Sequence, residues 1–176
     1  MIYKATLIAL FLTITIAGKA QENKVQWLSF EEAVKQNEQA PKKILVDVYT
    51  DWCGWCKKMK KQTFNHPDIA QYINKNFYPV RFDAESKKEV QFKGKTFSRP
   101  NKSGRQSHEL AVALLRGRMS YPSVAYLDGQ NRLITAVPGY YSPKDMEPIL
   151  KYFVTEAYKE KSFEDFKKDF RHSLID

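Results

Sequence analysis

The sequence predicts an α/β domain with a central mixed β-sheet flanked by helices. Two apolar segments, 44–49 and 77–84, are typical of strands, and the chain between them favours helix, so they form a parallel β-α-β unit. Two further strand segments, 124–127 and 132–137, are joined by an Asp-Gly dipeptide that favours a tight antiparallel hairpin. Parallel and antiparallel neighbours together make the predicted sheet mixed.

Helices are expected on both sides of the first strand. The N-terminal helix lies within 27–38, where Ser29 and Glu32 match the pattern of a capping box. The helix that follows the first strand is expected to break near Asn65, and a short second helix then continues to about residue 76.

The second half of the chain adds three helices. Ser107 is expected to cap a helix that runs through Leu115, and Ser142 to cap the final helix of the domain at 142–153. Aromatic residues then recur at helical spacing, which predicts an extra amphipathic helix at about 158–172 that packs on the domain.

Cysteine occurs only twice, at Cys53 and Cys56, directly after the first buried strand. The residues from Cys53 onward favour helix, so the pair lies at a turn between a strand and a helix. Backbone amides and the dipole at a helix N-terminus favour a thiolate at Cys53. Cys56 follows one helical turn later, close enough for the two sulfur atoms to form a disulfide.

Structural and metal-binding roles explain this pair less well. Two cysteines cannot form a framework of several disulfides, and a structural zinc ion needs four ligands. The three histidines show no metal-ligand spacing and are expected at the surface or at helix ends: His66, His108 and His172. We therefore expect no metal and no cofactor, and a catalytic redox role for the cysteines.

The segment Trp-Cys-Gly-Trp-Cys-Lys, with an aspartate inside the preceding strand, resembles the active site of the thioredoxin family. The residues that match in register are Asp47, Trp52, Cys53, Cys56 and Lys57. Trp55 departs from the family pattern, which usually has proline there, so the family's redox potential does not carry over. The resemblance extends over about residues 42–154 and implies a thioredoxin fold with an inserted hairpin and a C-terminal helical extension.

The resemblance also implies thiol–disulfide exchange, with Cys53 as the nucleophile and Cys56 as the resolving cysteine. Asp47 lies inside an apolar strand, so burial is expected to raise its pKa, and it is expected to accept the proton of Cys56 directly or through water. The alternative for Asp47 is a strand position turned to solvent at a sheet edge.

A second segment is expected to complete the substrate-binding surface. Tyr121 and Pro122 precede the strand 124–127, where thioredoxin-like proteins keep a cis proline, so the resemblance implies a cis bond between them. The exposed backbone of Tyr121 then pairs with an extended substrate like an added strand. The other residues expected to contact substrate lie beside the cysteines: Trp52, Gly54 and Trp55.

Two segments have no counterpart in a minimal thioredoxin-like domain. Residues 1–20 combine a lysine, an apolar run of 13 residues and small residues at the end, the pattern of a cleaved signal peptide, which leaves one domain at 21–176. The apolar run is too short for a membrane span. Residues 85–106 form a basic insertion with a short hairpin that either decorates a surface edge or covers the active-site side.

The formal net charge is +9, but basic residues are scattered among acidic ones, so no nucleic-acid partner is expected. The signal peptide predicts export to the periplasm, with secretion as the alternative. The expected partners are proteins that carry disulfides and a membrane-embedded electron donor. No stable membrane insertion is expected after signal cleavage.

The residues leave the direction of exchange open. Reduction of protein disulfides is the first interpretation, because the motif with its acid in the strand resembles the reducing branch of the family. Disulfide oxidation or isomerisation is the alternative within the same class of enzyme. A non-catalytic binding module, with idle cysteines and a basic insertion that recruits a partner, is the alternative from another class.

Overall fold

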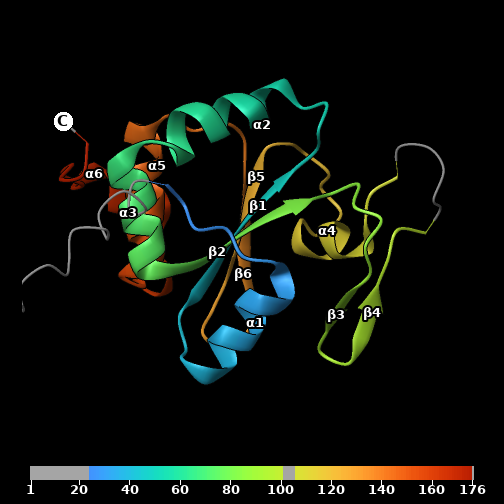
Figure 1. Cartoon of the computed structure of the whole chain (residues 1–176). Coiled ribbons are helices and arrows are strands. Elements are labelled where there is room, and N and C mark those ends of the chain that lie inside the picture. The colour runs from blue at the N-terminus through green and yellow to red at the C-terminus, as the bar shows by residue number, and fades with distance from the viewer. Residues whose placement is uncertain (1–23, 101–105, 176) are drawn as a thin grey trace, which may run out of the picture.

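The computed structural model describes residues 24–100 and 106–175 of the chain, so the predicted signal peptide lies outside the described residues. Four strands form one sheet in the order β2-β1-β5-β6 (Figure 1). β1 (Lys43–Tyr49) runs parallel to β2 (Phe77–Asp83) and antiparallel to β5 (Ser123–Leu127), and β6 (Leu133–Pro138) pairs antiparallel with β5. The predicted mixed sheet, with its β-α-β unit and its hairpin, is confirmed.

Helices cover both faces of this sheet (Figure 1). α1 (Phe30–Gln39) and α4 (Glu109–Leu114) pack with Val46 and other residues of β1 on one face. α3 (Pro67–Asn76) and α5 (Pro143–Val154) pack with Leu45 on the other. The two hydrophobic cores therefore lie on opposite sides of β1, which is buried from Ile44 to Val48.

The predicted caps of two helices are confirmed. The Ser29 hydroxyl accepts a hydrogen bond from the amide of Glu32, and the Glu32 carboxylate accepts one from the Ser29 amide, so the capping box is complete. Ser142 caps α5 in the same way, through the amide of Asp145. These caps satisfy amides at the helix starts that have no partner inside the helix.

The helix that carries the cysteines is short. α2 (Gly54–Met59) passes into a π-helical turn at Lys60–Phe64, and α3 begins after His66, so the predicted break near Asn65 is confirmed. The wide turn was not predicted. It buries both Thr63, which donates to the Tyr141 carbonyl at 2.6 Å, and Phe64, which packs edge-on against Trp27 at 5.2 Å.

The start of α4 differs from the prediction. His108 caps this helix, not Ser107: its Nδ1 accepts a hydrogen bond from the Leu110 amide at 3.1 Å. Of the two expected places for His108, the surface or a helix end, the second is confirmed: it is the N-cap of α4 and is fully buried. Its Nε2 lies 2.9 Å from the Lys88 carbonyl oxygen, and the ring therefore ties α4 to the inserted segment.

The insertion contains the predicted hairpin, made of β3 (Val90–Phe92) and β4 (Lys95–Phe97). Lys93 and Gly94 form the turn between these two strands. Both have positive φ, 50° and 73°, as a two-residue hairpin turn requires. Phe92 packs edge-on against Phe30 of α1 at 5.1 Å, which anchors the hairpin to the domain.

The C-terminal extension contains a 3₁₀ turn at Ala157–Lys159 and α6 (Phe163–Lys168), which is shorter than the predicted helix at 158–172. The ring centroids of Phe166 in α6 and Tyr152 in α5 lie 5.3 Å apart, so α6 packs on the domain. In the ranges 24–100 and 106–175, no helix is long and apolar enough to cross a membrane.

A buried carboxylate holds the end of the chain. Glu147 of α5 is fully buried, and its Oε1 accepts hydrogen bonds from the amides of Ser173 at 2.7 Å and Leu174 at 2.9 Å. Lys151 lies 3.0 Å from the same oxygen, and the His172 ring lies 2.8 Å from Oε2. Burial raises the pKa of Glu147, but the hydrogen bonds from Ser173, His172 and Lys151 outweigh it and lower the pKa to about 2.

We expect Glu147→Gln to lower the free energy of unfolding at pH 7 by about 2–3 kcal/mol, since it weakens several charge-assisted hydrogen bonds at once. The contribution of Glu147 is complete above its ordinary pKa of 4.5 and is lost as the pH falls toward 2. Urea unfolding at pH 7 and pH 3 measures both effects. Glu164→Gln on exposed α6 is the control, and equal stability of the two variants would contradict the role of Glu147.

Candidate active site

The chain turns from the C-terminal end of β1 into α2 (Figure 1), and Cys53 is the last residue of this turn while Cys56 lies in the first turn of α2, as predicted. They form a disulfide, with their Cα atoms 5.3 Å apart. Cys53 is the N-cap of α2, and its Sγ accepts a hydrogen bond from the Cys56 amide at 3.0 Å. The same amide can stabilise a thiolate on Cys53 once the disulfide is reduced. Cys56 is the more deeply buried, 1% exposed against 5% for Cys53.

Aromatic side chains flank the disulfide. Trp52 and Trp55 are among the most exposed large apolar residues of the described chain, at 51% and 57%. Trp52 packs edge-on against Tyr121, with ring centroids 6.0 Å apart, and Trp55 lies against Tyr140 at 5.3 Å. Gly54 lies between them, with open space around it. The predicted contact residues Trp52, Trp55 and Tyr121 thus belong to one surface, and Tyr140 was not predicted.

The bond between Tyr121 and Pro122 is cis, as the resemblance implied. The Pro122 carbonyl accepts a hydrogen bond from the amide of Gly139 at 2.8 Å. This bond joins the segment before β5 to the segment after β6, and it brings Tyr121 and Tyr140 to the same end of the sheet as the cysteines.

Asp47 is buried within β1, at 1% exposure, so the alternative of a solvent-facing edge position is wrong. Side chains alternate along a strand, so Asp47 shares the sheet face of Leu45, which packs in one cluster with Met59 at the end of α2. Burial raises the pKa of Asp47 to about 6, although the charges of Arg81 and Lys60 act to lower it. The predicted shift is confirmed.

Arg81 is the partner of Asp47 and was not predicted. The two residues face each other across β1 and β2, and Arg81 Nε donates to Asp47 Oδ2 at 3.1 Å. Asp47 Oδ1 has no hydrogen-bond partner among the described residues. The Arg81 guanidinium also lies 3.7 Å from the centre of the Tyr49 ring, beside a hollow of about 360 Å³ that Ser29 and Lys88 help to line.

We expect Arg81→Leu to raise the pKa of Asp47 above 6 by about one unit, because the nearest positive charge is removed. Arg81→Lys keeps the charge and is the matched control. The ¹³C chemical shift of the Asp47 carboxyl, followed by NMR through a pH titration, measures this change. A pKa that stays the same in Arg81→Leu would mean that Arg81 does not set the charge state of Asp47.

The insertion touches the site through its first residue. Trp52 Nε1 donates to the Glu85 carboxylate at 3.0 Å, and the hydroxyls of Tyr121 and Ser107 lie 3.3 Å apart.

Lys57, which matches the thioredoxin pattern after Cys56, is exposed on α2. No group of three or more histidine, cysteine or acidic residues within 24–100 and 106–175 is arranged to hold a metal ion.

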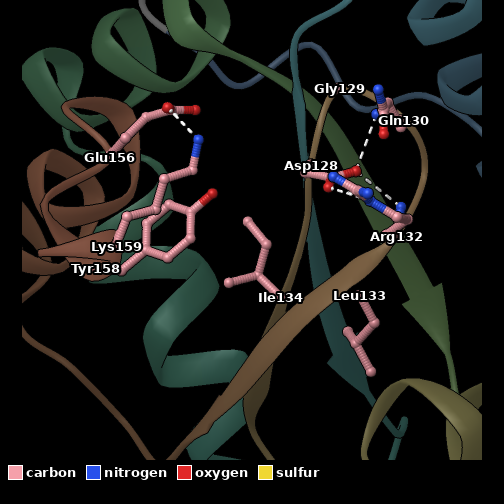
Figure 2. A pocket seen from close by; sticks show the side chains of 9 residues that line it. All are labelled: Asp128, Gly129, Gln130, Arg132, Leu133, Ile134, Glu156, Tyr158 and Lys159. Atoms are coloured by element: carbon pink, nitrogen blue, oxygen red, sulfur yellow. Dashed lines mark hydrogen bonds and ion pairs between the residues drawn. The ribbon is translucent and has the colours of Figure 1, made fainter.

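A second hollow, of about 470 Å³, lies beside the turn between β5 and β6 (Figure 2). This turn is at the opposite end of the sheet from the cysteines, since Leu127 pairs with Ile44 at the start of β1. The charged side chains that line the hollow pair with one another. Figure 2 shows Arg132 against Asp128, at 2.7 Å, and Lys159 against Glu156, at 2.5 Å. Paired charges leave the lining close to neutral, and we assign it no role.

Comparison with known proteins agrees with this arrangement. Residues 30–154 match the thioredoxin-like domain family, and the chain therefore belongs to that family. Among solved structures, the DsbH oxidoreductase superposes with a TM-score of 0.54 at 17% identity, covering 88% of this chain and 96% of its own. A thioredoxin from Thermus thermophilus gives a TM-score of 0.55 at 12% identity, covering 85% and 99%. These likenesses show the thioredoxin fold.

Curated relatives match over shorter segments. An uncharacterised protein of Archaeoglobus fulgidus is 27% identical over 88 residues, which are 49% of this chain and 69% of that protein. Spermatogenesis-associated protein 20 of Rattus norvegicus is 31% identical over 87 residues, 47% of this chain and 10% of that protein. The thiol:disulfide interchange protein DsbD of Photorhabdus laumondii is 34% identical over 47 residues, 27% of this chain and 8% of that protein. Most of the length of the last two proteins thus lies outside the match.

Together, the family match, the fold and the site define a thioredoxin-like protein. The chain has the fold of thiol–disulfide oxidoreductases and a Cys-X-X-Cys pair at disulfide distance.

Proposed function

We propose that this protein reduces disulfides in other proteins, with Cys53 and Cys56 as its reactive dithiol. The observation that carries the proposal is the position of Cys53, which caps α2 and is bonded to Cys56, on a sheet whose central strand holds the buried Asp47. A helix N-terminus supports the thiolate form of the nucleophile, and a buried carboxyl with a raised pKa supports a role as proton acceptor.

The proposed reaction has two steps. The Cys53 thiolate attacks one sulfur of the substrate disulfide, a new bond forms between Cys53 and that sulfur, and the other substrate sulfur leaves as a thiolate. Cys56 gives its proton to Asp47, directly or through water, and attacks Cys53, which releases the second substrate thiolate and forms the Cys53–Cys56 disulfide. Two electrons pass to the substrate, and its two thiolates take up the two protons that the protein's thiols lose.

The protein must be reduced again after each cycle, and we propose a membrane-embedded dithiol donor as the source of electrons. The short match to the thiol:disulfide interchange protein DsbD supports a thiol redox partner of this kind. We also propose that residues 1–20 are a signal peptide and that the protein acts in the periplasm. The apolar run near the N-terminus supports export.

The reduction potential of the Cys53–Cys56 pair tests the direction of exchange. Equilibration against a dithiothreitol or glutathione series is expected to give a value near about −270 mV, in the range of a reductase. A value of about −120 to −180 mV would instead assign oxidation or isomerisation. If the pair cannot be reduced and reoxidised at all, the redox function is wrong and a binding module is the remaining interpretation.

A further inference from the structure

We propose that the surface around Trp55 selects disulfides that lie beside acidic residues in an extended segment of a partner protein. This inference rests on the proposed exchange reaction and adds the class of substrate. We call this surface the lysine–aromatic surface: Trp55, Tyr140 and Lys58 are in contact with one another, and the exposed Lys57 and Lys61 of the same stretch of chain add positive charge.

The apolar part of this surface is built by two rings from different parts of the chain. Trp55 follows Cys53 by two residues on α2, and Tyr140 comes from the segment after β6, one residue beyond Gly139. Tyr140 also donates its hydroxyl to Gln62 at 2.8 Å, which holds the ring against the cysteine-bearing helix. Trp55 remains more than half exposed, so it offers an apolar contact next to the disulfide.

The charge on this surface has one sign. From Gly54 to Phe64 the chain has four lysines and no acidic residue, and all four lysines are exposed: Lys57, Lys58, Lys60 and Lys61. The Lys58 ammonium lies 4.6 Å from the centre of the Trp55 ring and 5.1 Å from that of Tyr140. A positive charge is therefore held directly over the apolar contact, and it fits a carboxylate on the incoming segment.

The other side of the disulfide, beside Trp52, carries acidic side chains together with Arg99, whose Nη1 donates to the Glu85 carbonyl at 3.2 Å. Trp52 donates to the Glu85 carboxylate, and the Glu85 amide in turn donates to Asp83 at 2.9 Å. Asp51 directly precedes Trp52 and is exposed. Charge of one sign is therefore confined to the Trp55 side of the disulfide, which favours an orientation that sets the carboxylates of the segment on that side.

Two disulfide peptides test the inference. They share one aromatic residue next to the bond and differ only in two glutamates or two lysines beside one cysteine. Each rate constant with the reduced protein is divided by that of the same peptide with 2-mercaptoethanol, which removes intrinsic reactivity. At about 20 mM salt we expect a ratio on the order of tenfold in favour of the acidic peptide, falling toward one at about 500 mM salt.

The double variant Lys58→Glu/Lys61→Glu is expected to abolish or invert this ratio. The double variant Lys93→Glu/Lys95→Glu makes the same change of charge in the hairpin of the insertion, which lies away from α2 (Figure 1), and is expected to keep the ratio. Comparing ratios within each variant cancels any general effect on Cys53.

Failure of this inference can be told apart from failure of the proposed function. The uncharged bis(2-hydroxyethyl) disulfide reports exchange without charge selection. If the wild-type protein reduces it and shows no preference between the peptides, or if Lys58→Glu/Lys61→Glu keeps the preference, the inference is overturned and exchange stands. If the protein reduces none of these disulfides, both are overturned.

Discussion

Replacing Cys53 by serine is expected to lower the rate of disulfide reduction to that of the buffer alone. The serine hydroxyl stays protonated at neutral pH and does not form the mixed disulfide, because the thiolate is the nucleophile in this exchange. The substitution should disturb the fold little, because only oxygen replaces sulfur at the N-cap of α2 and serine is a favoured residue at this position. Turbidity during reduction of a disulfide-linked protein, with dithiothreitol as the electron source, measures the rate.

Cys56→Ser is the matched variant, and it is expected to fail at the second step. Cys53 still attacks, but nothing resolves the product, so a mixed disulfide between Cys53 and the substrate should accumulate. Mass spectrometry under non-reducing conditions detects this adduct, and it should be absent from Cys53→Ser. Full activity of Cys53→Ser would mean that the cysteines are idle and would support a binding module instead.

The features that could be predicted from the sequence are those that depend on residues close together in the chain. The Cys-X-X-Cys pair at a helix start, the aspartate in an apolar strand and the Ser29 capping box each depend on residues within a few positions of one another. The hairpin between β5 and β6 likewise follows from its Asp-Gly turn. Such patterns favour particular dihedral angles and set which side chains share a face, and neither depends on distant parts of the chain.

The rest depends on how distant segments meet. Arg81 reaches Asp47 only because β1 and β2 pair in a register that sets these two residues opposite each other. Glu147 is an ordinary acidic residue in an amphipathic helix until the last residues of the chain fold back onto it. His108 caps α4 through Nδ1, while its Nε2 is hydrogen-bonded to the Lys88 carbonyl of the insertion. No local pattern indicates this second contact. In each case the deciding partner lies at least 20 residues away.

Asp47→Asn is expected to separate the stability of this protein from its activity. Asp47 has a pKa of about 6 in the folded protein against an ordinary 3.8, so wild-type stability falls as the pH rises from about 4 to about 6. A shift of this size corresponds to a gain of at most about 3 kcal/mol in the free energy of unfolding of the variant. The net gain is smaller, because the variant also leaves Arg81 without its charged partner. Asparagine does not ionise, so the oxidised variant should gain stability over the wild type across this pH range and keep the gain at pH 8. Urea unfolding at pH 4 and pH 8 measures it.

The same substitution is expected to slow the resolving step by about 10²-fold, because the proton of Cys56 loses its acceptor. The wild-type rate of this step should rise with pH through about 6, where Asp47 ionises, and the variant should lose that rise. Single-turnover release of the second substrate thiol isolates the step from Cys53 attack. Asp169→Asn is the control: it makes the same substitution at an exposed carboxyl of the C-terminal extension, and it should change neither the stability nor the rate of the resolving step. A variant that gains stability yet resolves at the wild-type rate would leave Asp47 as a buried charge without a role in proton transfer.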